Sequence, residues 1–235
     1  MLDMIRKNFT HVTQNSEKVI PGSLFISMND KYIDAAINNG ARGVVSANTH
    51  NLKVPSYVHD PVSTKRYMLK ALHNRLPNLI GITGTDGKTT TSSIIHHLLD
   101  DKSGIIGTTG IRYKKNQIET DLTTPTLEVI YEYMDIFKNS NMDTTVLEVS
   151  SEGILNNRIL GLGFDVCIFT NLSHEHLNSH KDMNEYLNTK ALLFKQLKQN
   201  GIAVVNKDDK YFEELVNQIE HKTITYGFNE TSDYL

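Results

Sequence analysis

The stretch GITGTDGKTTT, residues 81–91, decides the fold of this chain, because it has the makeup of a phosphate-binding loop. An apolar, strand-like run precedes it, and a segment with helical periodicity follows it. Gly84 and Gly87 allow a tight turn that points backbone N–H groups at an anion, at the positive end of the helix. Lys88 would then reach the β/γ oxygens of a nucleotide, and the Thr89 hydroxyl would ligate Mg²⁺.

The spacing of this loop departs from the strict Walker motif. Ile82, and not a glycine, lies five residues before Gly87. A glycine-rich strand-to-helix turn with an incidental Lys-Thr pair is therefore the alternative interpretation.

Strand-like apolar runs alternate with helical periodicity through most of the chain, which predicts an α/β fold with parallel strands and helices on the sheet faces. GIRYKKNQIET predicts a β-hairpin, and MNEYLNTKALLFKQL predicts one long helix. Gly40 fits a helix C-terminus, and Ser63 or Thr64 fits an N-cap. Because Pro77 interrupts the chain before the phosphate-loop strand, we expect a small α/β domain over 1–77 and a P-loop-type, mostly parallel-sheet domain over 78–235.

Composition excludes several classes of protein. The 235 residues are 39% hydrophobic and 22% charged with a net charge of −3, which argues against broad electrostatic attachment to nucleic acid or anionic lipid. Cys167 is the single cysteine and lies in the apolar run VCIF, so we expect a buried thiol and no disulfide. The sequence has no membrane-length apolar stretch and no signal-peptide pattern, so we expect a cytoplasmic protein without membrane or nucleic-acid partners.

Two further polar segments follow apolar strands, where α/β nucleotide sites collect their side chains. Glu148, in LEVSSEG, is placed to be a metal carboxylate, and a solvated acid at a strand end is the alternative. FTNLSHEHLNSH (169–180) gathers ionisable side chains that could bind metal or polarise a phosphate, although their spacing matches no zinc signature: His174, Glu175, His176 and His180. A surface role for each histidine remains the alternative.

Lys190 is an anomaly in its helix. It falls on an apolar stripe with Leu187, Ala191 and Phe194. Burial would lower the pKa of this lysine and make its neutral amine available for chemistry. The alternative is a lysine whose ammonium snorkels to water from the edge of the stripe.

The ordered set TGTDGKTT, DLTTPT, LEVSSEG, FTNLSHEHLNSH and NTKALLF resembles the Mur ligase family, and within it the MurE type. The resemblance runs from about residue 14 to the end of the chain and is strongest across 79–197. It implies addition of the third amino acid to UDP-N-acetylmuramoyl-L-Ala-D-Glu in peptidoglycan precursor synthesis. ATP would phosphorylate a substrate carboxylate to an acyl phosphate, the amine of an amino acid would attack, and phosphate would leave.

The resemblance also assigns residue roles. It implies that the ATP phosphates are bound by Gly84, Thr85, Asp86, Gly87, Lys88, Thr89 and Thr90. The implied Mg²⁺ ligands are Thr89, Glu148, His176 and Lys190, the last as the carbamate formed with CO₂. The implied catalytic residues are Lys88, Lys190 and His176. The implied substrate-binding residues are Ser16, Thr123, Thr124, Ser150, Asn156 and Arg158.

Departures from the family pattern gather around the expected UDP-sugar site of the N-terminal domain. Asn15-Ser16-Glu17 replaces Asp-Ser-Arg, and the loop between Met28 and Tyr32 is short. In the central domain, Leu122 and Glu152 stand where Asn and His are typical.

Family members also carry a C-terminal domain that binds the incoming amino acid. We therefore expect this chain to hold the N-terminal domain and most of the central one, to be monomeric, and to be inactive or only partly active alone. A poly-γ-glutamate or folylpolyglutamate synthase-like ligase is one alternative, and a non-catalytic nucleotide-binding paralogue is another.

Overall fold

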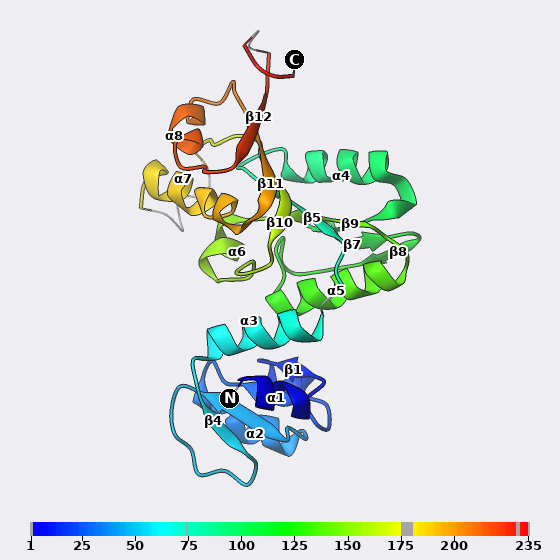
Figure 1. The fold of residues 1–235 in the computed structure, drawn as a ribbon, viewed down its shortest axis with the longest axis vertical. Helices are drawn as coiled ribbons and strands as arrows, with labels where there is room; N and C mark the ends of the chain where they lie inside the picture. Colours follow the sequence, from blue (N-terminus) through cyan, green and yellow to red (C-terminus); the bar gives the residue numbers. More distant parts are fainter. Residues whose placement is uncertain (1, 74, 175–180, 229–230, 235) are drawn as a thin grey trace. The chain divides into compact units, whose positions relative to one another are not determined.

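The computed structural model describes residues 2–73, 75–174, 181–228 and 231–234. The chain forms two compact units, Met1–Asn74 and Arg75–Leu235 (Figure 1). The boundary expected from the sequence, between residues 77 and 78, falls a few residues later. Within the described ranges, no helix is both long and apolar enough to span a membrane.

The first unit is a four-stranded parallel sheet, in the order β1-β2-β3-β4, with helices on both faces. Leu24 and Ile26 of β2 pack on one face with residues of α1 and α3, whereas Phe25 packs on the other face with residues of α2, as the two-residue period of a strand requires. Its elements are α1 (Leu2–Asn8), β1 (Val12–Thr13), β2 (Leu24–Ile26), α2 (Ile33–Asn38), β3 (Gly43–Ser46), β4 (Ser56–Val58) and α3 (Pro61–Leu72).

Helix α3 begins earlier than the sequence predicted. Asp60 is its N-cap and accepts a hydrogen bond from the backbone N–H of Ser63 at 2.8 Å, while Pro61 occupies the first helical position. The prediction of Ser63 or Thr64 as the cap was wrong, because Asp-Pro already supplies a capping carboxylate and a preset φ angle. The helix end at Gly40 is confirmed, since Gly40 follows the C-cap of α2 with φ of 106°.

The second unit is built on an eight-stranded sheet in the order β12-β11-β10-β5-β9-β6-β7-β8. Strands β12 to β6 are parallel, as predicted, and the predicted hairpin forms the antiparallel strands β7 and β8. Helices α4 and α5 cover opposite faces of this sheet (Figure 1). The strands are β5 (Asn78–Thr83), β6 (Ser103–Gly107), β7 (Gly110–Tyr113), β8 (Asn116–Ile118), β9 (Thr144–Glu148), β10 (Phe164–Phe169), β11 (Leu197–Asn206) and β12 (Lys222–Tyr226). The helices are α4 (Lys88–Leu99), α5 (Leu127–Asn139), α6 (Ser151–Leu155), α7 (Met183–Ala191) and α8 (Phe212–Val216).

The long helix predicted over MNEYLNTKALLFKQL is shorter in the structure. Helix α7 ends at Ala191, a 3-10 turn spans Phe194–Gln196, and β11 begins at Leu197. The backbone N–H of Leu193 bonds to the carbonyl of Lys190, a three-residue step that tightens the chain at the helix end. Leu197, the last residue of the predicted helix, pairs with Phe164 of β10, so the chain leaves the helix to enter the sheet.

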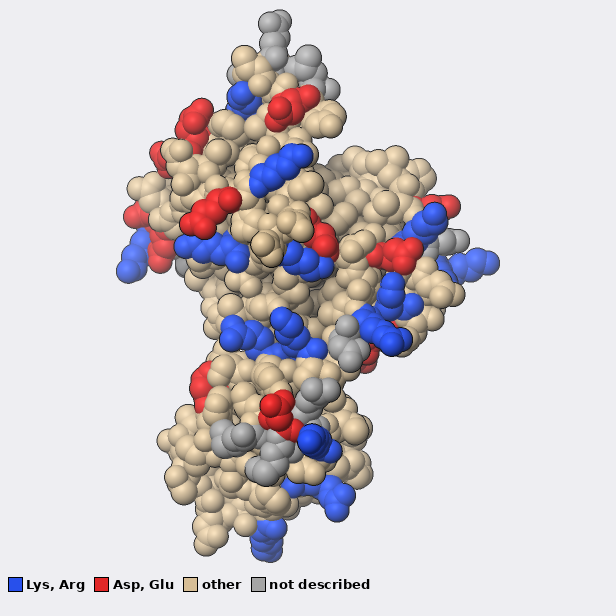
Figure 2. All heavy atoms as spheres, viewed as in Figure 1, with Lys and Arg blue, Asp and Glu red and all other residues tan. Residues whose placement is uncertain are grey.

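Charges of both signs are interspersed over each unit on the face shown in Figure 2. Cys167 is buried in β10 and is free, as predicted.

Candidate active site

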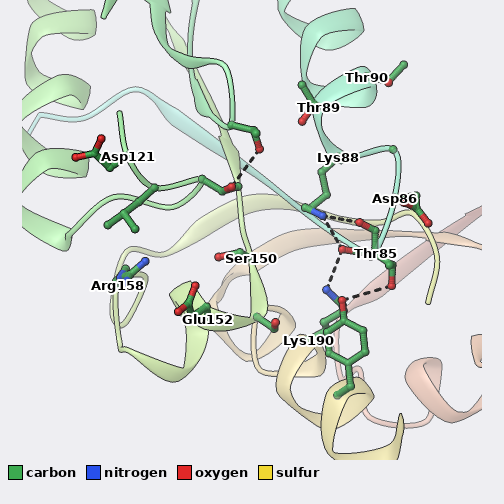
Figure 3. Close-up of a pocket in the computed structure, with 17 residues that line it drawn as sticks. Thr85, Asp86, Lys88, Thr89, Thr90, Asp121, Ser150, Glu152, Arg158 and Lys190 are labelled. Atoms are coloured by element: carbon green, nitrogen blue, oxygen red, sulfur yellow. Dashed lines mark hydrogen bonds between the residues drawn. The ribbon is translucent and has the colours of Figure 1, made fainter. Parts of the chain in front are cut away.

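A cavity of about 520 Å³ lies where β5, β6 and β9 end, so parallel strands deliver their polar termini to one place (Figure 3). The phosphate-type loop forms one wall, and the segments after β8 and β9 form another. The lining residues are Gly84, Thr85, Asp86, Gly87, Lys88, Thr89, Thr90, Thr108, Asp121, Leu122, Thr123, Ser150, Ser151, Glu152, Arg158, Tyr186 and Lys190.

The glycines of the loop occupy backbone conformations that side chains disfavour. Gly84 has φ of 152°, and a Cβ there would overlap the Thr170 hydroxyl. Gly87 has φ of 78° and is the N-cap of α4, where no side chain caps the helix. The first-turn N–H groups and the helix dipole thus face the cavity as an anion site.

The end of β10 holds this loop in place. Asn171 accepts the Thr85 N–H on its carbonyl at 2.9 Å and the Asp86 N–H on its side chain at 2.9 Å. The Thr170 hydroxyl donates to the Asp86 carbonyl at 2.7 Å. Thr170 and Asn171 directly follow β10, which pairs with β5, so the end of the neighbouring strand fixes the backbone of the loop.

Two lysines converge on one carbonyl of the loop. Lys88 Nζ donates to the carbonyls of Gly84 at 2.9 Å and Thr85 at 2.7 Å, and Lys190 Nζ donates to the same Gly84 carbonyl at 2.9 Å (Figure 3). Lys190 is 1% exposed and its Nζ lies 4.3 Å from the centre of the Tyr186 ring. Burial, and next the charge of Lys88, lower the pKa of Lys190 well below its usual value. The predicted burial is confirmed, and the snorkelling alternative is wrong.

Glu148 ends β9 beneath the cavity and is fully buried, so the alternative of a solvated acid is wrong. Its Oε2 accepts from the hydroxyls of Thr89 at 2.8 Å and Thr108 at 2.9 Å, and its Oε1 accepts from Ser92 at 3.0 Å. Among the described residues, none forms an ion pair with it.

A buried carboxylate without a cationic partner suits a divalent cation. Thr89 and Glu148 offer two oxygen atoms for Mg²⁺, which characteristically takes few protein ligands and completes its shell with phosphate and water. In the described ranges, no three His, Cys, Asp or Glu side chains cluster as a self-sufficient metal site.

Hydrogen bonds connect the two segments that we expect to bind the acceptor, one around Thr124 and one from Ser150 to Arg158. Thr124 is buried, its hydroxyl donates to the Glu148 carbonyl at 2.9 Å, and it accepts the Ser150 N–H at 2.9 Å. Arg158 Nη1 donates to the Thr124 carbonyl at 3.1 Å. Thr123 extends the same segment into the cavity, where its hydroxyl lies 3.1 Å from that of Thr108.

Two of the predicted site residues, Asn156 and Ser16, lie elsewhere. Asn156 is absent from the cavity lining, and its amide donates to the Glu152 carbonyl at 2.8 Å. Ser16 belongs to the first unit, in a short 3-10 turn. His176 lies outside the described residues, as do Glu175 and His180.

Residues 82–235 match the Mur ligase middle domain. The chain belongs to the Mur ligase family.

Mur ligases are also the named relatives of the chain along nearly its whole length. It is 34% identical to a UDP-N-acetylmuramoyl-L-alanyl-D-glutamate–2,6-diaminopimelate ligase of Bacillus cereus, covering 96% of this chain and 50% of the relative. It is 33% identical to UDP-N-acetylmuramyl-tripeptide synthetase 2 of Oceanobacillus iheyensis, covering 95% and 50%. The chain therefore spans about half the length of the curated relatives it matches.

Solved Mur ligase structures share the fold. The structure of a UDP-N-acetylmuramoyl-L-alanyl-D-glutamate–2,6-diaminopimelate ligase superposes with a TM-score of 0.80 at 28% identity, over 96% of this chain and 50% of that one. MurF of Thermotoga maritima, solved in complex with ADP, has a TM-score of 0.63 at 21% identity, over 97% and 52%, and shows the fold alone.

The candidate site also includes residues that the sequence patterns did not indicate. Thr108, Ser92 and Tyr186 each contact a residue that had been singled out. Thr108 directly follows β6, so the strand-end rule that selected Glu148 could have found it. Ser92 and Tyr186 lie within helices among ordinary helix positions, and nothing in the sequence pattern distinguishes them.

Proposed function

We propose that this chain carries the nucleotide and acceptor sites of a MurE-type ligase, which uses ATP to join an amino acid to UDP-N-acetylmuramoyl-L-Ala-D-Glu. The observation that carries the proposal is the convergence of Lys88, Lys190 and Glu148 at the N-terminus of α4. Relatives named as ligases of this kind match 95–96% of the chain, which favours this substrate class over folylpolyglutamate synthesis.

In this proposal, the loop from Gly84 to Thr90 surrounds the ATP phosphates. Lys88, which now donates to the loop carbonyls, would donate to the β/γ oxygens, and Thr89 and Glu148 would hold Mg²⁺. His176, the further proposed ligand, lies outside the described residues. When bound, Mg²⁺ would neutralise part of the phosphate charge. Lys88 and the end of α4 stabilise the charge that develops as the acceptor carboxylate attacks the γ-phosphate.

Lys190 is proposed to capture CO₂ as a carbamate, a reaction that requires a neutral amine. The lowered pKa of the buried Lys190 amine supports this role. The product would be a carboxylate-like group beside the Gly84 carbonyl of the phosphate loop, and such an oxygen group could serve as a Mg²⁺ ligand.

The acceptor dipeptide is proposed to lie along Thr123, Thr124, Ser150 and Arg158, with Asn156 at its margin. The first unit would bind the UDP-sugar end, with Ser16 at the uridine. ATP converts the acceptor carboxylate to an acyl phosphate, and an amino acid amine then displaces phosphate to form the amide. Because ATP and a nucleotide-linked acceptor are water-soluble, a cytoplasmic location is part of the proposal.

Calorimetry of nucleotide binding tests the proposal directly. ADP is titrated with Mg²⁺ into wild type and into Lys88→Ala, which removes a charged donor and is expected to cost about 1.5–3 kcal/mol of binding. Lys198→Ala is the matched control, since Lys198 is half-exposed and pairs with Asp165 outside the cavity lining. Equal ADP affinity in wild type and Lys88→Ala would contradict the nucleotide assignment.

A second titration tests the acceptor class. Wild type is expected to bind UDP-N-acetylmuramoyl-L-Ala-D-Glu, and Arg158→Ala is expected to weaken that binding without weakening ADP binding. An acceptor affinity unchanged in Arg158→Ala would contradict the acceptor assignment while leaving the nucleotide site intact.

A further inference from the structure

A chain of hydroxyl groups joins the acceptor side of the cavity to the buried carboxylate. The Thr123 hydroxyl lies 3.1 Å from the Thr108 hydroxyl, which lies 2.9 Å from Glu148 Oε2. Thr89 donates to the same carboxylate oxygen from the phosphate loop. One carboxylate thus connects the nucleotide side of the site with the acceptor side.

The number of hydroxyl protons determines which group donates and which accepts in each of these hydrogen bonds. An ionised carboxylate only accepts hydrogen bonds, so Thr108 must give its single hydroxyl proton to Glu148. Thr108 can then only accept from Thr123, which leaves the order Thr123 to Thr108 to Glu148. Consecutive hydrogen bonds of one polarity strengthen each other.

The surroundings of Glu148 leave its carboxylate little freedom. Ser92 is fully buried and donates to Oε1 at 3.0 Å, so this oxygen is held from the protein interior. A Cβ on Gly107, the residue before Thr108, would overlap the carboxylate. Thr108, which lines the cavity, therefore contacts the carboxylate from the side that opens to the cavity.

We propose that Thr108 is a positioning residue, which aims Oε2 of Glu148 at the Mg²⁺ site and couples it to Thr123 of the acceptor site. The inference rests on the proposed function, because it needs a nucleotide–metal site. Partners that orient a metal ligand commonly change metal affinity by tenfold or more. Thr123 and Thr108 connect the acceptor site to Glu148. A ligand that contacts Thr123 would therefore change the strength of the hydrogen bond from Thr108 that orients the Glu148 carboxylate.

The test measures how strongly Mg²⁺ tightens ADP binding, as the ratio of the Kd in EDTA to the Kd in Mg²⁺. Thr108→Val keeps the shape but removes the hydroxyl, and is expected to lower this ratio about tenfold while leaving the Kd in EDTA unchanged. Thr108→Ser keeps the hydroxyl and is expected to restore the ratio. Thr123→Val, which does not touch Glu148, is expected to lower it about twofold.

Controls separate this inference from the proposed function. A ratio near one in wild type would overturn the proposed nucleotide–metal site itself. If Glu148→Gln has a lower ratio than wild type but Thr108→Val has the same ratio as wild type, the role of Thr108 alone is overturned. A ratio unaffected by Thr123→Val would overturn the coupling to the acceptor side. Thermal unfolding of each variant serves as the control for stability. If Thr108 had only a structural role, its substitution would lower Tm and leave the Kd ratio as in wild type.

Discussion

Lys190→Met tests whether the buried amine of Lys190 lowers the free energy of unfolding. Methionine fills a similar volume without a charge, and Lys190 is 1% exposed on α7. We expect the variant to be more stable than wild type at neutral pH when nucleotide and CO₂ are absent.

The magnitude follows from the contacts of the amine. Burial of an ammonium costs several kcal/mol, and the adjacent charge of Lys88 adds repulsion. The hydrogen bond to the Gly84 carbonyl offsets about 1.5–3 kcal/mol of this, and the contact with the Tyr186 ring about 2 kcal/mol. The net gain on substitution is therefore about 1–3 kcal/mol in the free energy of unfolding.

The sign of the pH dependence is also fixed. Burial and then Lys88 lower the pKa of Lys190 in the folded state, so between that value and 10.5 the unfolded chain binds more protons than the folded chain. Wild-type stability should rise with pH across this window by up to about 1.4 kcal/mol per pH unit. The advantage of Lys190→Met should accordingly be smaller at pH 9.5 than at pH 7.5.

Urea unfolding in CO₂-free buffers at the two pH values measures both quantities, because other titrating groups cancel in the difference between variants. Lys198→Met is the matched control, since a half-exposed lysine in a surface ion pair contributes about 0–1 kcal/mol. A stability difference for Lys190→Met that does not change with pH would refute the reasoning, as would a clear loss of stability at both values.

Two further predictions concern other parts of the chain. Hydrogen bonds from Asn48 and then Ser27 lower the pKa of Asp30 from 3.8 to about 2. Asp30→Ala should therefore lower the free energy of unfolding by about 1–2 kcal/mol above pH 3.8, after allowance for the partial exposure of Asp30, and this loss should vanish as the pH falls toward 2. Urea unfolding at pH 6 and pH 3 checks this, and an equal cost at both values would contradict it. Gly84→Ala should cost about 1–3 kcal/mol of unfolding free energy from the disfavoured φ angle alone and weaken ADP binding, because the new methyl group displaces Thr170 from the loop. Thermal unfolding and calorimetry measure the two effects, and a variant that matches wild type in both would contradict the geometry.

Much of the fold was predictable from local signals. The alternation of strand and helix patterns predicted the parallel sheet, and the antiparallel hairpin β7–β8 was also recognisable. Where Asp60 caps α3 and where α7 ends at Ala191, the sequence predictions were wrong. The first error overlooked a stronger local signal, because Asp60 and Pro61 together fix the start of α3. The second arises because the chain leaves the helix to enter the sheet, which a helical pattern in the sequence does not reveal.

The site was predictable to the extent that its residues are chemically unusual for their positions. A lysine on an apolar stripe and an acid at the end of a buried strand stand out, and both Lys190 and Glu148 are buried in the structure. Thr108 does not stand out, since a single threonine after a strand has no chemical signature of its own. Its importance comes from a contact with a residue that is 40 positions away in sequence.

The central position of β5 has a consequence for how this chain folds. Its phosphate loop is completed by Lys190, 106 residues away in sequence, and by Glu148, 59 residues from Thr89. Strand β5 also pairs in parallel with β9 and β10, which lie far from it in sequence. Long-range contacts of both kinds form slowly, because loop-closure entropy is lost before the contacts compensate for it. A nucleotide would therefore recognise only chains in which the sheet has closed, and at 100 times its Kd it would favour them by about 2.7 kcal/mol. Refolding yield and protease resistance should then respond to nucleotide at the last step of assembly and not before.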